Sequence, residues 1–390
     1  MAKFDFNNSR YAKFFADKEN QRFLQTFLDN RDIFFTNYGW YLTQGRIAPN
    51  PTPTNVDGVA TFTVKARPLE AAPMMDLRAP LGDSNQMDSK GLEWYSATIP
   101  DFIAPGFVET AAERDYKSRQ FEEFGNDADI VAQWAQKVQT QIDSGDATMN
   151  FMTATLMSKG FIDYTGIGRG ISAPLHKASI PAENFKGAGA KAWADETVKL
   201  LSWMKTEEAK YREERGGYGG GLVWQMTRKT YYDVFLKNAE VEELVKNYRY
   251  LNRLAYTDGM PVTSSEFNVA FGDYEGVSPI VIVTEKERNM THTSDTFVKG
   301  WADSIVVLRP AGDAVEFEHT NILDERMVNQ YGASAITTVF GRTNNGLGLL
   351  ANTTTDNGRF KEWHTDLMMS AVPALVNFPN HVIYDITKTD

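Results

Sequence analysis

The sequence predicts an α+β protein, and two kinds of pattern carry this prediction. From Arg119 to Lys159 the apolar residues recur at intervals of three and four, which is the spacing of one face of a long helix. Elsewhere the apolar residues gather in short runs that are typical of strands, among them Val59–Ala66, Pro279–Thr284 and Ser304–Leu308. A chain with one long helix and several short strands belongs to a mixed class.

The composition excludes several functional classes. The chain has 390 residues, of which 42% are hydrophobic and 23% charged, as in ordinary globular proteins. It has no cysteine, which excludes disulfides, thiolate zinc sites and thiol nucleophiles. The net charge of −11 is opposite to that of proteins that grip nucleic acid by its phosphates. A chain of this kind that meets DNA would contain the DNA rather than clamp it.

Residues 1–45 are rich in aromatic side chains and compatible with helix. They lack the basic and then apolar plan of a signal peptide. A segment this apolar must dock, either on the core of its own chain or as an arm over a neighbouring subunit. A proline-rich spacer, Ala48–Thr54, follows and cannot be helical.

The stretch Arg67–Tyr95 has little capacity to form a core, because prolines, glycines and the polar run GDSNQMDSKG fill it. We expect an extended loop here, with Met74–Leu77 and Leu92–Tyr95 pairing as a two-stranded ribbon. An isolated ribbon is marginal in water, so a partner would support it. The chain then enters the helical stretch, with Thr110 as a candidate N-cap and Glu113 at the capping-box spacing.

The helical stretch has one continuous apolar stripe before residue 143. The stripe alone would span roughly 35 Å at 1.5 Å per residue. Asp143–Asp146 would then break or bend the helix, and a second run ends at Lys159-Gly160. The stripe fits an amphipathic core helix or coiled coil, and it also fits a spine laid across a sheet in a shell subunit. The residues predicted to pack in the spine are Phe121, Phe124, Val131, Ala135, Val138 and Ile142.

The remaining elements follow in order along the chain. Continuous apolar runs predict strands buried on both faces, whereas amphipathic runs predict helices. We expect helices at Ala192–Arg212 and Arg228–Tyr250, strands at Leu222–Met226, Pro279–Thr284, Ser304–Leu308, Ile336–Phe340, Glu362–Ser370 and Val382–Thr387, a linker at Pro181–Ala190, and a Gly/Asn/Thr-rich loop at Gly341–Gly358.

Chemical motifs are scarce. Tyr164–Gly170 resembles a phosphate-binding glycine loop only superficially, because no Lys-Ser/Thr pair follows it, and a glycine turn is the better account. His319 with Glu316, Glu318 and Asp324 could compose a metal site, although a solvated acidic strand and turn is far more common. We therefore predict a structural protein that is not an enzyme, with no catalytic, cofactor-binding or metal-binding residues.

Four segments share their layout with one known family. They are MMDLRAPLGDSNQMDSKGLEWYSATIPDFIAPGFVETAAERD, MNFMTATLMSKGFIDY, the block Ala192–Asn247, and the late strands SIVVLRPAGDAVEF and KEWHTDLMMSAVPALVNFPNHVIYDIT. Together they resemble the major capsid proteins of tailed bacteriophages, specifically the capsid protein E (lambda-like) family. The likeness is one of layout and short patterns over nearly all of the chain.

This resemblance implies the Hong Kong 97-type phage capsid fold. Its parts would be an N-arm (1–57), the extended loop and its flanks (58–110), a peripheral domain with a long spine helix (111–189), an axial domain (190–335), and C-terminal strands that return to the peripheral domain (336–390). The extended loop would lie across the adjacent subunit. The predicted subunit-contact residues are Met74, Met75, Leu77, Arg78, Leu92, Trp94 and Tyr95.

The resemblance also implies a function and a set of partners. The chain would be a major capsid protein that self-assembles into hexamers and pentamers of an icosahedral phage head. The head would enclose double-stranded DNA without sequence-specific binding, and it would assemble in the host cytoplasm with no membrane and no cofactor. A scaffold protein, a portal and a decoration protein would be further partners. The alternatives are an encapsulin-like compartment shell protein of the same fold, and an unrelated α/β enzyme.

Overall fold

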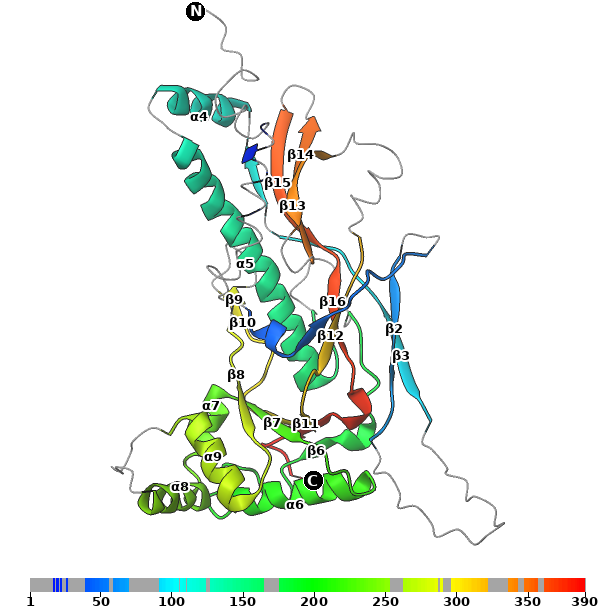
Figure 1. The fold of residues 1–390 in the computed structure, drawn as a ribbon, viewed down its shortest axis with the longest axis vertical. Helices are drawn as coiled ribbons and strands as arrows, with labels where there is room; N and C mark the ends of the chain where they lie inside the picture. The colour runs from blue at the N-terminus through cyan, green and yellow to red at the C-terminus, as the bar shows by residue number, and fades with distance from the viewer. Residues whose placement is uncertain are drawn as a thin grey trace, which may run out of the picture.

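Figure 1 shows the computed structural model of the chain, in which two lobes are joined by a long helix and a ribbon runs along one side. The structure describes residues 17, 19, 20, 22, 26, 39–55, 59–69, 91–104, 106–109, 111–123, 127–164, 175–252, 262–286, 288–289, 296–321, 336–342, 347–356 and 361–389.

The upper lobe contains the long helix, two sheets and the ribbon. One sheet has the order β1-β12-β16, and the other has the order β13-β14-β15-β4 with β5 also pairing with β15. The elements are η2 (Gly39–Thr43), β1 (Gly45–Ile47), β2 (Thr61–Ala66), β3 (Glu93–Thr98), β4 (Phe102–Ile103), β5 (Phe107–Glu109), α4 (Ala111–Glu123), α5 (Asp127–Lys159), β9 (Arg288–Asn289), β10 (Phe297–Val298), β12 (Val315–His319), β13 (Ile336–Arg342), β14 (Gly348–Asp356), β15 (Lys361–Met369) and β16 (Ala371–Leu375).

The lower lobe is a five-stranded sheet, β6-β17-β11-β7-β8, with helices beneath it (Figure 1). Strands β7 and β11 are buried almost throughout, as their continuous apolar runs predict. The elements are η3 (Ala182–Asn184), β6 (Phe185–Gly187), α6 (Leu200–Glu214), β7 (Leu222–Thr227), α7 (Arg228–Thr230), the π-helical turn η4 (Tyr231–Phe235), α8 (Ala239–Leu251), α9 (Ser264–Glu275), β8 (Ile280–Val283), β11 (Ile305–Pro310), η5 (Phe378–Asn380) and β17 (Val382–Asp385).

Helix α5 is the longest element, with 33 residues and a length of about 50 Å. The prediction of one stripe from Phe121 to Ile142 on a single helix is wrong, because α4 ends at Glu123 and α5 begins at Asp127. The helix also runs straight through Asp143–Asp146. Gly145 serves packing rather than a bend, since a Cβ at that position would lie 3.3 Å from the Leu367 side chain of β15.

The predicted spine residues differ in their burial and in the helix to which they belong. Val138 and Ile142 are buried, whereas Ala135 is half-exposed. Phe121 belongs to α4 rather than α5, and Val131 lies within α5. Phe124 lies outside the described residues. The sheet-facing side of α5 also carries polar groups, and the Gln141 amide donates a 2.6 Å hydrogen bond to the Thr365 carbonyl of β15.

The described ribbon consists of β2 and β3, and the predicted pairing of Met74–Leu77 lies outside the described residues. Strand β3 returns as expected, but it pairs antiparallel with β2, from Thr61 opposite Thr98 to Ala66 opposite Glu93. The alternation of Val59–Ala66 is a stronger strand signal than Met74–Leu77. The prolines and glycines between the two strands are therefore in the connection, as the sequence predicts.

Several other elements differ from the prediction. The helix expected at Arg228–Tyr250 is interrupted after the π-helical turn, where Asn238 caps the start of α8 by accepting from the Glu240 N–H. Helix α6 begins only at Leu200. Strand β14 occupies much of the expected loop Gly341–Gly358, because its threonines favour a strand once β13 and β15 flank it. Helix α9 and strands β12 and β16 are additional elements.

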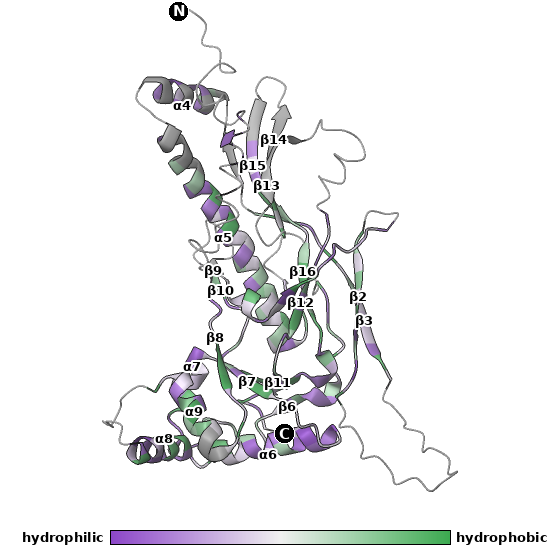
Figure 2. Ribbon diagram, in the orientation of Figure 1, coloured by the Kyte–Doolittle hydropathy of each residue, from purple (hydrophilic) through white to green (hydrophobic). Residues whose placement is uncertain are grey.

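Two strands cross the expected domain boundaries. Strand β12, inside the expected axial range, pairs with β1 and β16 beside the spine helix. Strand β17, inside the expected peripheral return, pairs with β11 and β6 in the lower sheet. Figure 2 shows apolar residues on β12 and β16 of the upper lobe and on β7, β8 and β11 of the lower one, and each lobe has its own core cluster of buried residues.

A buried polar network lies where the two lobes meet. The Arg309 guanidinium of β11 donates to the Gln225 side chain of β7 at 2.9 Å and to the Gly312 carbonyl at 2.8 Å. The Gln225 amide in turn donates to the Gln44 side chain at 2.8 Å, just before β1 of the upper lobe. Among the described residues Arg309 has no salt bridge, and burial lowers its pKa to about 10.

The side of α5 that faces the sheet can be tested with two matched substitutions. Val138→Asp would bury a carboxylate without a partner and lower the free energy of unfolding by more than about 4 kcal/mol. Ala135→Asp lies one turn earlier on the same side of α5, where the side chain is only half-buried, and should change it by less than about 1 kcal/mol. Urea denaturation of the unassembled subunit measures both, and equal effects would show that Val138 is not more deeply packed than Ala135.

Candidate assembly surfaces

The β2–β3 ribbon has two chemically different faces. Along β2 the residues alternate between exposed and buried, and Phe62, Val64 and Ala66 point into the core of the upper lobe. On the opposite face the hydroxyls of Thr63 and Ser96 form a 2.8 Å hydrogen bond across the two strands. One face therefore belongs to this chain's own core, and the other faces outward.

Tyr95 fastens the inner face of the ribbon to the body. Its phenol oxygen accepts a 2.8 Å hydrogen bond from the Leu375 N–H and lies 3.3 Å from the Leu375 carbonyl. Its ring meets Phe378 edge-on, with the centroids 5.1 Å apart, and stacks on His176. Because Tyr95 is only 5% exposed, its prediction as a subunit-contact residue is corrected: the side chain already fills its own core.

The outer face carries large apolar side chains in water. Trp94 lies directly opposite Lys65 in the ribbon and is 66% exposed, and Leu92 at the foot of β3 is 57% exposed. An exposed tryptophan on an otherwise polar strand face is uncommon in a protein that works as a monomer, and it is typical of contact surfaces. The other predicted contact residues, Met74, Met75, Leu77 and Arg78, lie outside the described residues.

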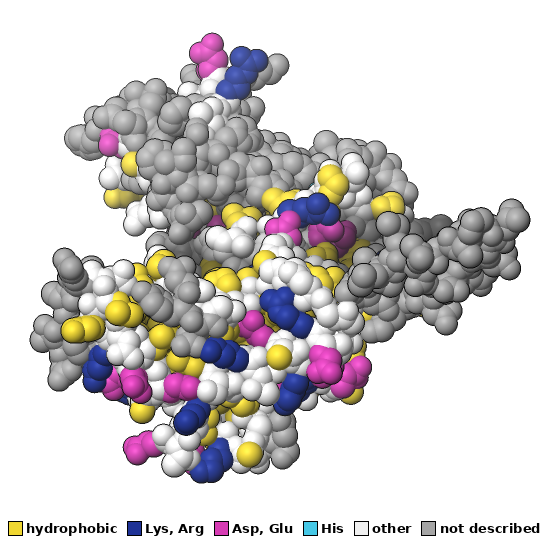
Figure 3. Space-filling model, turned by 60° about the horizontal axis from the view of Figure 1, so that its bottom comes forward, with side chains coloured by type: hydrophobic (Ala, Val, Ile, Leu, Met, Phe, Trp, Pro, Cys, Tyr) yellow, Lys and Arg dark blue, Asp and Glu magenta, His cyan; other side chains and the backbone are white. Residues whose placement is uncertain are grey.

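Other exposed apolar residues were not predicted. They lie on strands and helices of both lobes, where the apolar pattern alone does not show which residues are exposed. They include Ile103, Tyr116, Tyr250, Leu251, Val281 and Phe297. In the view of Figure 3, acidic and basic side chains are interspersed with apolar ones over the described part of the surface.

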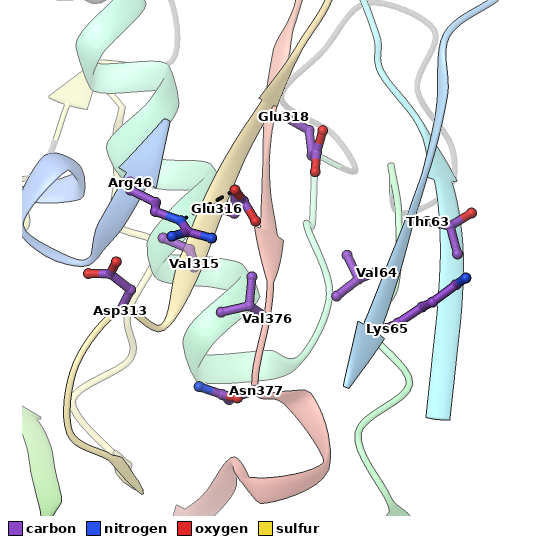
Figure 4. A pocket seen from close by; sticks show the side chains of 10 residues that line it. All are labelled: Arg46, Thr63, Val64, Lys65, Asp313, Val315, Glu316, Glu318, Val376 and Asn377. Carbon is purple, nitrogen blue, oxygen red and sulfur yellow. Dashed lines mark ion pairs between the residues drawn. The ribbon is translucent and has the colours of Figure 1, made fainter. Parts of the chain in front are cut away.

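A cleft of about 440 Å³ separates the ribbon from the β12–β16 sheet (Figure 4). On its sheet side Glu316 pairs with Arg46 at 3.4 Å, and the Thr52 hydroxyl donates to Glu318 at 3.0 Å. Burial, and then the nearby Glu316 charge, raise the pKa of Glu318, while the bond from Thr52 lowers it.

Glu316, Glu318 and His319, the described residues of the possible metal site, do not form a metal-binding group. The His319 ring nitrogen Nε2 lies 3.1 Å from the Ala48 carbonyl, and Asp324 lies outside the described residues. Within the part of the chain that the structure describes, no group of three or more histidine, aspartate or glutamate side chains could hold a metal ion. In the same part, none of the helices has the length and apolarity that a membrane span requires.

Similar solved structures span nearly the whole chain. A prophage protein of E. coli CFT073, described as a capsid protein, is 13% identical in sequence and has a TM-score of 0.49. The alignment covers 94% of this chain and 98% of that chain. A phage-related protein from Bordetella bronchiseptica RB50 is 12% identical, with a TM-score of 0.47, 94% and 97% covered. The capsid of cyanophage A-1(L) is 12% identical, with a TM-score of 0.45, 84% and 88% covered.

No protein-family profile matches the chain, and no curated protein matches it. The three structures are only 12–13% identical in sequence to this chain.

The packing of His176 under the ribbon makes the stability of the subunit depend on pH. Its ring centroid lies 5.9 Å from that of Phe62 and 6.2 Å from that of Tyr95, and neither ring nitrogen has a hydrogen-bond partner among the described residues. Burial lowers the pKa of His176 from 6.5 to about 4. The unfolded chain therefore binds this proton near pH 6.5, but the folded chain binds it only near pH 4.

The sign of the effect follows from these two values. The contribution of His176 is fully present above its unfolded pKa of 6.5, falls as the pH drops, and is lost below about pH 4. Between about pH 7 and about pH 5 the free energy of unfolding should fall by roughly 2 kcal/mol on account of this residue. His176→Phe keeps an aromatic ring and should remove this part of the dependence of the free energy of unfolding on pH, as measured by urea denaturation at several pH values. The buried ring of His381 has the same lowered pKa, but its contribution is present in both proteins and cancels in the comparison. An unchanged slope in His176→Phe would contradict the assignment.

Proposed function

We propose that this chain is the major capsid protein of a tailed bacteriophage, with the Hong Kong 97-type capsid fold. The observation that carries the proposal is the ribbon, which buries one face in its own core and holds Leu92 and Trp94 in water on the other side. An exposed apolar patch of this kind marks a contact surface. In a shell, a copy of the same chain covers it at every position.

The rest of the architecture supports this proposal. A 33-residue spine helix, a two-stranded ribbon and a separate lower lobe are the parts that the resemblance of the sequence implies. In this proposal the lower lobe is the axial domain, the upper lobe is the peripheral domain, and residues 1–57 form the N-arm. Met74, Met75, Leu77 and Arg78 would extend the contact of Leu92 and Trp94 over the neighbouring subunit.

The charge of the chain fits a container. The net charge of −11 would repel a polyanion packed inside, so the shell would enclose double-stranded DNA without gripping it. The chain would form hexamers and pentamers in the host cytoplasm and remain in the virion, with a scaffold protein, a portal and a decoration protein as further partners. It would have a structural role and no enzymatic one.

Two adjacent residues of β3 test the proposal, because they lie on opposite faces of the ribbon. Trp94→Ser should change the free energy of unfolding by less than about 0.5 kcal/mol but abolish shell assembly. Tyr95→Ser, the matched control, should destabilise the subunit by roughly 3–5 kcal/mol, because it removes a buried aromatic ring and its hydrogen bonds. Urea denaturation, sedimentation and negative-stain microscopy measure these outcomes.

Three results would count against the proposal. Normal shells from Trp94→Ser would show that this face is not a subunit contact. A wild-type chain that forms no particles under any assembly condition would show that it is not a shell protein. Particles that hold protein rather than nucleic acid when made in the natural host would point to a compartment shell of the same fold.

A further inference from the structure

Strand β8 leaves one edge of the lower sheet open. The sheet ends with β8, which pairs in parallel with β7, Ile282 lying opposite Met226. Among the described residues no strand pairs with the other edge of β8. A row of unpaired backbone groups at a sheet edge is a template for another extended chain.

The hydrogen bonds around β8 show which groups face outward. The Trp224 N–H of β7 donates to the Pro279 carbonyl at 2.9 Å, so Pro279, Val281 and Val283 turn their backbone groups toward β7. The alternate residues, Ile280 and Ile282, turn theirs to the outer edge.

Only the first outward position is occupied. The Asn268 side chain accepts from the Ile280 N–H and donates to the Ile280 carbonyl, both at 2.8 Å, which imitates a neighbouring strand. At Ile282, one step along, no described residue hydrogen-bonds the outward N–H or carbonyl.

The surroundings of this edge suit an extended segment. An open groove of about 840 Å³ lies between β8, α9 and the η4 turn, with Tyr232 and Ser265 in its lining. Val281 is 37% exposed and Val269 of α9 is 46% exposed. Strand β8 has neither a lysine nor a bulge, the usual devices that keep an edge unpaired. The groove therefore offers backbone hydrogen bonds and apolar contact together.

The ribbon is the element that matches this groove. Its two strands pair only with each other among the described elements, so each has a free edge, and Leu92 and Trp94 add exposed apolar area. In Figure 1 the ribbon lies on the opposite side of the molecule from β8. A contact between two different surfaces on opposite sides repeats head to tail, and it closes into a ring where the rotation between successive copies allows it, as the proposed hexamers and pentamers require.

We infer that the open edge of β8 receives the ribbon of the next copy around a ring. This inference rests on the proposed shell function and names the surface that covers the outer face of the ribbon. Backbone pairing at Ile282 fixes the register, and the apolar contact of Val281 and Val269 with the ribbon supplies the area.

Engineered cysteines can test this contact against a clean background, because the natural chain has none. Ser96→Cys on the outer face of the ribbon and Val281→Cys on β8, combined in one chain, should give a ladder of covalent oligomers on a non-reducing gel of oxidised shells. A control chain with Ser96→Cys and Thr206→Cys, the latter exposed on α6, should give monomers under the same conditions.

A proline at the open edge provides a second test. Ile282→Pro removes only an outward N–H, and edge strands tolerate proline at such positions, so the subunit should fold but lose assembly. Ile282→Ala is the matched control, because it shortens the same side chain but keeps the N–H, and it should still assemble.

The outcomes separate this inference from the proposed function. Wild-type shells that form normally, with no ladder from the Ser96/Val281 pair or with an equal ladder from the control pair, would overturn the inference and leave the function standing. Normal assembly of Ile282→Pro would also overturn it. A wild-type chain that forms no shells would overturn both.

Discussion

Directional hydrogen bonds along α5 fix the position of almost every other part of the upper lobe. The Tyr41 hydroxyl donates to Asp146 at 2.9 Å, and the Tyr41 N–H donates to Asn150 at 2.9 Å, which holds η2 on the helix. Further along, the Ser158 hydroxyl reaches the Gly300 carbonyl. Apolar contacts alone would let a 33-residue helix slide against its sheets, but a buried polar group that loses its partner costs about 1–3 kcal/mol. These bonds therefore fix the position of the helix relative to η2 and to the segment at Gly300.

The parts of the fold that the sequence could predict are those determined by local pattern. The helix of α5 and strands β2, β7, β8 and β11 follow from spacing that each stretch carries by itself. The end of α4 at Glu123 is not visible in the spacing of the apolar residues, because their stripe continues past it. A Cβ at Gly145 would lie 3.3 Å from the Leu367 side chain, which is a contact between distant parts of the chain that local pattern does not show. Strand β14 was mistaken for a loop for the same reason, since its pairing with β13 and β15 outweighs its glycines and asparagines.

In the candidate site, too, the sequence alone could not predict which side of a strand is buried. Trp94 and Tyr95 are adjacent aromatic residues, and alternation places them on opposite faces of β3 without saying which face is inside. The pairing with β2 and the hydrogen bonds of Tyr95 to Leu375 decide this, and both join residues that are far apart in the sequence. The sequence also could not predict that β8 lies at the edge of its sheet, because a short apolar run is compatible with both a central and an edge strand.

The buried network around Arg309, between the lobes, bears on how the subunit responds to salt. Arg309 is held by the Gln225 amide oxygen and by carbonyl groups instead of carboxylates, and it is almost fully buried. Mobile ions screen exposed charge pairs strongly but reach buried groups far less. These bonds should therefore hold the two lobes together equally well at low and at high ionic strength, and in the proposed shell they would do so whether or not nucleic acid and its counterions lie beside the subunit.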